Sequence, residues 1–155
     1  MKNKNLQQGI YTPENPSKYL GDPSNIVFRS GWERIYFIKC DRNTNIVAWA
    51  SEELIIPYYS TVDKRARRYF PDVLLHVRKE DGSIEKTLVE IKPYKETIKP
   101  VMPKRMTKKT RARMLEEHIT YQRNMDKWEA ASKYCAKHGM RFGLVTEYEL
   151  GLKKR

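Results

Sequence analysis

Cysteine is scarce in this sequence, and long apolar runs are missing. The two cysteines, Cys40 and Cys135, form no CxxC pair and are too few for a disulfide framework, so we expect a protein of a reducing compartment. No run approaches the ~18 consecutive apolar residues that a membrane-spanning helix needs, and we expect no membrane partner. The first residues, MKNKNLQQGIY, carry positive charge but no apolar segment, so we expect no secretory signal there.

Motifs for zinc and nucleotide chemistry are also lacking. The histidines, His76, His118 and His138, lie far apart in the sequence and have no cysteine partners at zinc-site spacing. No glycine-rich phosphate loop occurs, so we expect no nucleotide cofactor. With 155 residues, 39% of them hydrophobic and 11% aromatic, the chain can bury a core, and we expect residues 1–155 to form one domain.

Acidic residues are outnumbered by basic ones. The chain has 19 Asp and Glu against 31 Lys and Arg, which gives a net charge of +12 at pH 7. This excess favours a polyanionic partner, most often nucleic acid, although a solubilising surface or an acidic protein partner would explain it too. The basic residues gather in one run before Tyr69 and another between Thr97 and Leu115. From these runs we expect DNA contacts by Lys64, Arg65, Arg67, Arg68, Lys104, Arg105, Lys108, Lys109, Arg111 and Arg113.

The spacing of apolar and turn-forming residues predicts an α/β protein. We expect an extended, proline-rich arm at 1–25, a helix opened by Ser30, strands at 46–49 and 54–59, a hairpin of 69–77 with 87–91, a basic proline-containing loop at 94–107, a long helix at 107–138 and a last strand at 141–146. The order we expect for the core is α-β-β-β-α-β. Gly139 is placed to end the long helix.

The predicted hairpin carries three charged residues whose placement depends on its loop. Glu90 and Lys92 are two apart on a strand and share one face. A two-residue turn at Asp81-Gly82 would place Asp72 on the opposite face. A three-residue loop, 80–82, pairs Lys79 with Ser83 and brings Asp72 opposite Glu90. We favour this loop because its last position requires a left-handed backbone, and Gly82 occupies it.

Two carboxylates at cross-strand distance repel each other unless a cation lies between them. Mg²⁺, with Mn²⁺ as a substitute, binds a few carboxylate oxygens and keeps several waters. We expect Asp72 and Glu90 to bind the metal together with the backbone carbonyl of Ile91. Lys92 would stabilise charge on a scissile phosphate or help to position or deprotonate the attacking water. This combination predicts metal-assisted hydrolysis of a phosphodiester.

A simpler interpretation is a surface strand of alternating charges, in which Lys92 pairs with Glu90 or Asp72. Three observations count against it. Apolar runs, Val73-Leu74-Leu75 and Leu88-Val89, adjoin the charged residues, and charges among such neighbours need a reason. The favoured loop places all three on one face, and the two basic runs bracket them in the sequence.

These motifs resemble the PD-(D/E)xK nuclease superfamily. The likeness rests on Pro71-Asp72, on Glu90-Ile91-Lys92 and on the order of elements. It implies a restriction-endonuclease-like fold, a mixed central sheet flanked by helices, whose acids bind Mg²⁺ and whose lysine assists cleavage of DNA. Members often carry a further acid on a helix before the first strand, and Glu33 matches it. Because Ser30-x-x-Glu33 is also a capping box, Glu33 has a purely structural explanation as well.

A narrower resemblance covers about Ser17 to Glu147. The segments Tyr69-Phe70-Pro71-Asp72, Glu90-Ile91-Lys92-Pro93 and Asp126-Lys127-Trp128 are similar to those of the head-completion nucleases of T-even-like tailed bacteriophages. This implies an endonuclease, with exonuclease activity as an option, that acts on packaged DNA before head–tail joining. The implied partners are head, portal or neck proteins, and the implied location is the host cytoplasm during assembly, with virion association as an option.

Alternatives stay open at this stage. A non-catalytic DNA-binding or virion-assembly protein would share charge and fold. The endonuclease subunit of heteromeric transposases has a similar core, but that role needs a larger interaction domain than this length allows. The Gln-x-x-x-Tyr pattern common in the superfamily fails, because Asp126 stands four residues after Gln122. Whether Gln122, Glu52 or Glu53 contributes to the site is not decided by the sequence.

Overall fold

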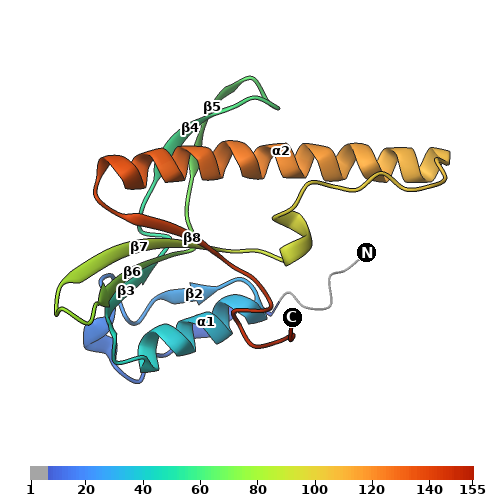
Figure 1. Ribbon diagram of the computed structural model, residues 1–155. Helices are drawn as coiled ribbons and strands as arrows, with labels where there is room; N and C mark the ends of the chain where they lie inside the picture. Colours follow the sequence, from blue (N-terminus) through green and yellow to red (C-terminus); the bar gives the residue numbers. More distant parts are fainter. Residues whose placement is uncertain (1–6) are drawn as a thin grey trace.

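A four-stranded mixed sheet forms the centre of the molecule (Figure 1). The computed structural model describes residues 7–155. The strands are β3 (Ile46–Ser51), β6 (Val73–Arg78), β7 (Ile84–Ile91) and β8 (Arg141–Val145), in the order β3-β6-β7-β8. Only β7 and β8 pair in parallel, because the helix α2 connects them. The order α1-β3-β6-β7-α2-β8 confirms the predicted core of a restriction-endonuclease-like fold.

Each face of the sheet packs against one helix. Helix α1 (Gly31–Arg42) lies on one face and α2 (Lys108–Lys137) on the other (Figure 1). The alternation of side chains along a strand divides the apolar residues between two cores. Val73 and Val89 belong to the core on the α1 side, whereas Leu88 packs with Trp128 of α2. Glu90 is two residues from Leu88, so its side chain belongs to the face that α2 covers.

The N-terminal segment is extended, but it is packed rather than a loose arm. From residue 7 on, β1 (Gly9–Tyr11) pairs antiparallel with β2 (Ile26–Phe28), and the short 3-10 helix η1 (Pro16–Lys18) lies between them. Tyr11 and Tyr19 are buried against Trp49, with ring centroids 6.1 and 4.8 Å away. These aromatic rings hold the predicted extended arm against the core, and residues 1–6 of that arm lie outside the described part of the chain.

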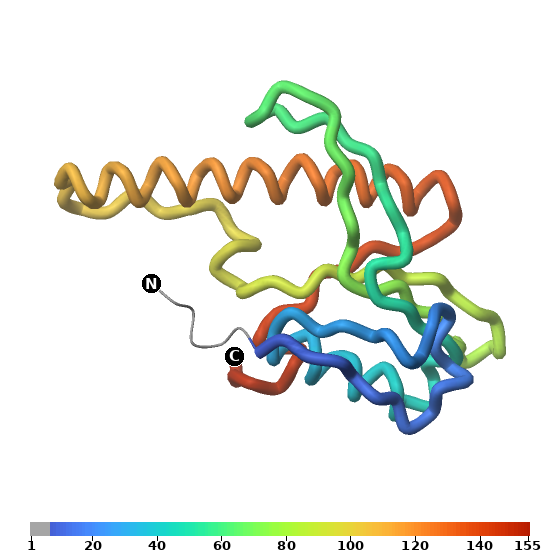
Figure 2. The backbone as a smooth tube through the Cα atoms, turned by 180° about the vertical axis from the view of Figure 1, so that it is seen from behind, coloured from blue at the N-terminus to red at the C-terminus, as the bar shows by residue number. Residues whose placement is uncertain are grey.

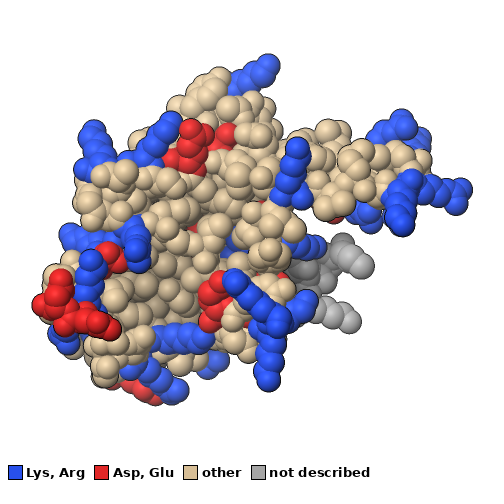
Figure 3. Space-filling model, viewed as in Figure 1, with Lys and Arg blue, Asp and Glu red and all other residues tan. Residues whose placement is uncertain are grey.

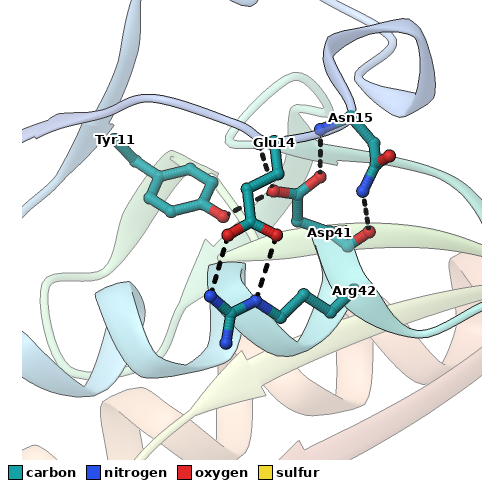
Figure 4. Close-up of polar contacts among 5 residues, drawn as sticks. All are labelled: Tyr11, Glu14, Asn15, Asp41 and Arg42. Carbon is teal, nitrogen blue, oxygen red and sulfur yellow. Dashed lines mark hydrogen bonds and ion pairs between the residues drawn. The ribbon is translucent and has the colours of Figure 1, made fainter.

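A buried carboxylate fixes this segment to the end of α1 (Figure 4). Asp41 accepts hydrogen bonds from the Tyr11 hydroxyl at 2.7 Å, from the Glu14 N–H at 2.7 Å and from the Asn15 N–H at 3.0 Å. The Lys18 ammonium donates to the carbonyls of Cys40, Asp41 and Asn43 at the C-terminus of the helix, and the Asn15 side-chain amide also donates to the Asp41 carbonyl at 3.1 Å. The chain therefore closes the end of α1 before it enters β2.

A second hairpin stands apart from the central sheet. It consists of β4 (Ile56–Ser60) and β5 (Arg65–Tyr69), which pair only with each other, and it packs on α2 (Figure 1). The sequence predicted a single strand over 69–77, and this was wrong. Tyr69 ends β5, and β6 begins at Val73. Pro71 lies between them and has no N–H to donate to a ladder, so the strand breaks there.

The long helix extends beyond the sheet. After the 3-10 helix η2 (Tyr94–Glu96), the loop runs to Thr107, whose side chain caps α2 by accepting from the Thr110 N–H at 3.2 Å. The N-terminal part of α2 projects from the molecule, and the preceding loop runs along it (Figures 1 and 2). The helix ends at Lys137, and Gly139 has a φ of +64°, as predicted for its termination. No helix in residues 7–155 is long and apolar enough to cross a membrane.

Candidate active site

The loop of the β6–β7 hairpin has the predicted three residues. Lys79 donates its N–H to Ser83 at 2.8 Å, Gly82 donates to Lys79 at 3.0 Å, and the φ of Gly82 is +83°. The pairing of Val73 with Val89 then brings Asp72, one residue before β6, opposite Glu90. The structure therefore places Asp72, Glu90 and Lys92 on the face of the sheet that α2 covers, as the loop geometry predicted.

Both carboxylates are withdrawn from water. Glu90 is 5% exposed and accepts a hydrogen bond of 2.6 Å from the Tyr69 hydroxyl. Asp72 is half-buried and accepts the Ile91 N–H at 2.7 Å. Burial, and after it the negative charge of Glu90, raises the pKa of Asp72. Burial likewise raises the pKa of Glu90, against the Tyr69 hydrogen bond and the charge of Lys92. The positive charge nearby is therefore too small to offset the burial and mutual repulsion of the two carboxylates.

Lys92 is the nearest cation, and the last strand holds it in place. Its ammonium lies 3.8 Å from Glu90 Oε1. Its backbone N–H donates to the carbonyl of Val145 in β8 at 2.9 Å. The parallel pairing of β7 with β8 therefore fixes the backbone from which Lys92 reaches the carboxylates.

Glu33 lies at the start of α1, where it serves the helix and also comes near the acids. Its N–H donates to the Ser30 hydroxyl at 3.2 Å, and its carboxylate accepts the Arg29 N–H at 2.9 Å. This is a capping arrangement. Burial raises the pKa of Glu33, and the charges of Glu52 and Glu90 raise it further. The capping role of Glu33 is therefore confirmed, and its role at the metal stays a prediction.

The residues left undecided by the sequence separate in the structure. Glu52 adopts a φ of +53°, donates its N–H to the Asp72 carbonyl at 3.1 Å and pairs with Arg29 at 2.6 Å. It lies at the edge of the site. Glu53 is exposed and lies against Gly21. Gln122 donates to Asp126 at 2.9 Å, and this bond stabilises α2 rather than the site.

Lys127 of α2 was not singled out as a site residue from the sequence, and the structure brings it close. It is half-buried, and its ammonium lies 5.8 Å from the centroid of the Tyr69 ring. Burial is the main cause that lowers the pKa of Lys127, and the positive charge of Lys92 lowers it further. The negative charge of Glu90 acts in the opposite direction and raises it. In the sequence Lys127 adjoins Trp128, a predicted core residue, and this gave no sign that Lys127 lies on the same side of the sheet as the acids.

The acids suit a hard cation that keeps most of its water. In residues 7–155 no three carboxylate, histidine or cysteine side chains gather closely enough to hold an ion by themselves. Asp72 and Glu90 offer oxygen ligands, and Mg²⁺ is commonly bound by one or two carboxylates with waters completing its octahedron. A zinc site would need more nitrogen or sulfur ligands than are present here. The donor set therefore fits Mg²⁺ or Mn²⁺.

The basic residues lie on two projecting segments, the β4–β5 hairpin and the N-terminal end of α2 (Figure 1). Lys64, with a φ of +51°, and Arg65 lie at the turn of the β4–β5 hairpin, and Arg67 and Arg68 follow on β5. Arg67 is paired with Asp63 at 2.7 Å. The second group occupies the loop end and first turns of α2, where blue side chains gather at the projecting tip in Figure 3: Lys104, Arg105, Lys108, Lys109, Arg111 and Arg113.

Comparison with known proteins agrees with the fold and identifies the family. Residues 43–147 match the family described as TnsA-like endonuclease N terminal. The chain therefore belongs to this family of endonucleases, and the resemblance to PD-(D/E)xK nucleases is confirmed. Over 139 residues it is 41% identical to the head completion nuclease of Enterobacteria phage T4, with 90% of each chain covered. The chain is a deoxyribonuclease related to that phage protein.

Proposed function

We propose that the chain is a Mg²⁺-dependent DNA endonuclease whose centre is formed by Asp72, Glu90 and Lys92. The observation that carries the proposal is the placement of Asp72 opposite Glu90, with the Lys92 ammonium 3.8 Å from Glu90. Asp72, Glu90 and the Ile91 carbonyl would hold the metal, with Glu33 as a further acid. When bound, the metal lowers the pKa of a water and offsets charge on the phosphate. Mn²⁺ would substitute for it.

The protein groups have separate tasks in this proposal. Lys92 lies at the open side of the acids, where its ammonium can stabilise negative charge that develops on the phosphate as water attacks. The Tyr69 hydroxyl holds one oxygen of Glu90 and leaves the other directed toward Lys92. The Ile91 N–H fixes the Asp72 carboxylate in the same way. Because these bonds come from neighbouring strands, the acids are oriented before any substrate binds.

Cleavage of supercoiled plasmid tests the centre. We expect activity with Mg²⁺ and none with EDTA. Asp72→Ala and Lys92→Met should each lower the cleavage rate at least about a thousandfold while the circular dichroism spectrum is unchanged. The controls are Glu80→Gln in the same hairpin loop and Lys86→Met, an exposed lysine on the same strand. Retained Mg²⁺-dependent cleavage in both site variants would refute the assignment and favour a non-catalytic DNA-binding protein.

The two basic groups would grip the DNA backbone. Helix α2 begins with basic residues and has no acid in its first turn. Cations there oppose the helix dipole, so they cost stability unless an anion such as a phosphate binds beside them. Changing Lys104, Arg105, Lys108 and Lys109 to Gln should lower the slope of log Kd against log salt by about 0.9 for each lost phosphate contact. Lys133→Gln with Lys137→Gln, at the other end of the same helix, is the matched control.

The phage relative suggests the biological setting. Its name describes head completion. We propose that this chain likewise acts on packaged DNA before head and tail join, in the host cytoplasm and in contact with head, portal or neck proteins. The test is an infection with a phage that carries Asp72→Ala. Heads that are filled with DNA but unable to join tails would support the role, and normal particle yields would reject it.

A further inference from the structure

The outer face of the β4–β5 hairpin has no role in the proposed hydrolysis, although it lies next to the centre. The strands pair Pro57 with Arg68 and Tyr59 with Ala66. Paired residues and residues two apart share a face, so Phe70, which directly follows β5, is in line with Arg68. One face of the hairpin therefore presents Pro57, Tyr59, Ala66, Arg68 and Phe70.

The two faces of the hairpin differ in exposure. On the inner face Ile56, Tyr58 and Tyr69 are buried in the core that α2 and Trp128 complete. On the outer face the Tyr59 side chain is 60% exposed and Phe70 is 41% exposed. Figure 2 shows the hairpin in front of α2, so its outer face is turned away from the helix. Two aromatic rings thus face solvent on a hairpin whose core needs neither of them.

Positive charge surrounds these rings. The Arg68 guanidinium lies 6.0 Å from the centroid of the Phe70 ring. A shallow hollow of about 490 Å³ is lined by Pro57, Ala66, Arg68 and Phe70, with Arg65 and Arg67 of the same strand at its rim. Its wall therefore combines apolar surface with the guanidinium group of Arg68. This is the pairing that binds unpaired nucleotides: the ring stacks on a base and the cation binds the adjacent phosphate.

We propose that this face binds single-stranded DNA, with bases stacked on Phe70 and Tyr59, beside the point of cleavage. The proposal rests on the nuclease function above and adds a preference for unpaired DNA. A duplex hides the faces of its bases in its own stack, so exposed rings gain nothing from intact double helix. Unpaired bases at a nick, gap, flap or frayed end offer both faces. The positive charge of Arg68 on this face, with Arg65 and Arg67 at the rim of the hollow, matches a DNA strand and disfavours a basic protein partner.

The surface is close to the centre and rigidly held. Tyr69 donates its hydroxyl to Glu90, and the next residue, Phe70, belongs to the outer face. Asp126 of α2 accepts from both the N–H and the hydroxyl of Thr61 at 2.8 Å, and Arg123 pairs with Asp63 at 3.2 Å. These bonds fix the hairpin tip to the helix. A nucleotide stacked on Phe70 would therefore be only a short distance from the phosphate over Glu90.

The test is binding of a fluorescent oligothymidylate and a matched duplex, measured by anisotropy in EDTA so that no cleavage occurs. Tyr59→Ala and Phe70→Ala should each weaken single-strand binding about tenfold and change duplex binding less than twofold. Tyr59→Phe and Phe70→Tyr, which keep the ring, should bind like the unaltered protein. Ile84→Ala, an exposed apolar residue at the far hairpin, is the control.

Equal weakening of both DNA forms, or no weakening of either, would overturn the stacking proposal and favour a protein partner for this face. A second measurement does not depend on whether the alanine variants fold. The unmodified protein should change the fluorescence of 2-aminopurine placed in the single strand. Unchanged fluorescence would count against stacking. Because these measurements need no metal, they remain informative if plasmid cleavage fails. Loss of cleavage with intact selective binding would reject the catalytic centre alone.

Discussion

Asp41 and Asp72 are both withdrawn from water, yet their surroundings are opposite. Asp41 is 1% exposed and accepts hydrogen bonds from Tyr11, Glu14 and Asn15. Burial raises its pKa, but these hydrogen bonds outweigh burial and lower it overall. Within residues 7–155 the Asp72 carboxylate accepts one hydrogen bond, from Ile91, and faces another acid. Burial and the charge of Glu90 together raise its pKa.

The difference predicts separate roles for the two carboxylates. A buried charge that has all its hydrogen bonds connects chain segments, as Asp41 connects the N-terminal segment to α1. A buried charge that lacks them costs stability, and folding alone gives no reason to keep it. Such strained electrostatics concentrate at functional sites, where a ligand supplies the missing charge. We therefore expect the two aspartates to respond in opposite ways to the same substitution.

The largest expected effect is on activity at Asp72. Asp72→Asn keeps the shape but removes the charge, and cleavage should fall at least about a thousandfold. The free energy of unfolding without metal should stay unchanged or rise by up to about 1 kcal/mol, because repulsion from Glu90 is relieved. Urea denaturation and plasmid cleavage measure the two effects. A clear loss of stability would mean that Asp72 is structural, like Asp41.

Asp41→Ala should show the reverse. It leaves the Tyr11 hydroxyl and two backbone N–H groups without their acceptor, and we expect the protein to lose about 2–3 kcal/mol of stability. Cleavage per folded molecule should stay within about twofold. Tyr11→Phe removes only one of these bonds and should cost about 1 kcal/mol. If Asp41→Ala folds normally but loses cleavage, the contrast between the two aspartates is wrong.

Acid should reveal the contribution of Asp41. Its pKa is lower in the folded protein than in the unfolded chain, so the unfolded state binds the proton more readily. Its stabilisation is complete above its unfolded pKa of about 3.9 and is lost as pH falls through the lower folded value. Urea midpoints measured from pH 6 down to about pH 3 should therefore fall less steeply in Asp41→Asn than in the unaltered protein. Parallel curves would contradict this.

The smallest effect is expected at Lys127, which lies near the acids without a direct ion pair to either in the described part of the chain. Lys127→Met should lower kcat/KM about tenfold through weaker phosphate binding, with KM affected more than kcat. Lys127→Arg should recover most of the loss. An equal loss in kcat alone, with KM unchanged, would place Lys127 in the chemical step instead.

The sequence was sufficient for the core and for the register of the acids. Gly82 and the count of loop residues determined which face Asp72 occupies, because a strand alternates strictly. The capping residues Ser30 and Gly139 likewise gave the helix ends closely. These are local rules, in which a few neighbouring residues decide the geometry.

Long-range packing is what the sequence did not reveal. Nothing local shows that Tyr11 reaches Asp41, thirty residues away, so the sequence predicted an extended arm without indicating what it packs against. The proximity of Lys127 to Glu90 depends on how α2 crosses the sheet. The β4–β5 hairpin was missed because β5 is mostly arginine and has few of the apolar residues that indicate a strand.

The parallel strand β8 gives the protein a built-in order of assembly. Val145 holds the backbone of Lys92, and it is reached only after the thirty-residue helix α2 has been traversed. During synthesis, a chain that has not yet emerged to this strand has its acids in a hairpin but no fixed position for its amine. A chain that stops before β8 is therefore expected to lack the backbone contact that positions Lys92, and with it the proposed centre.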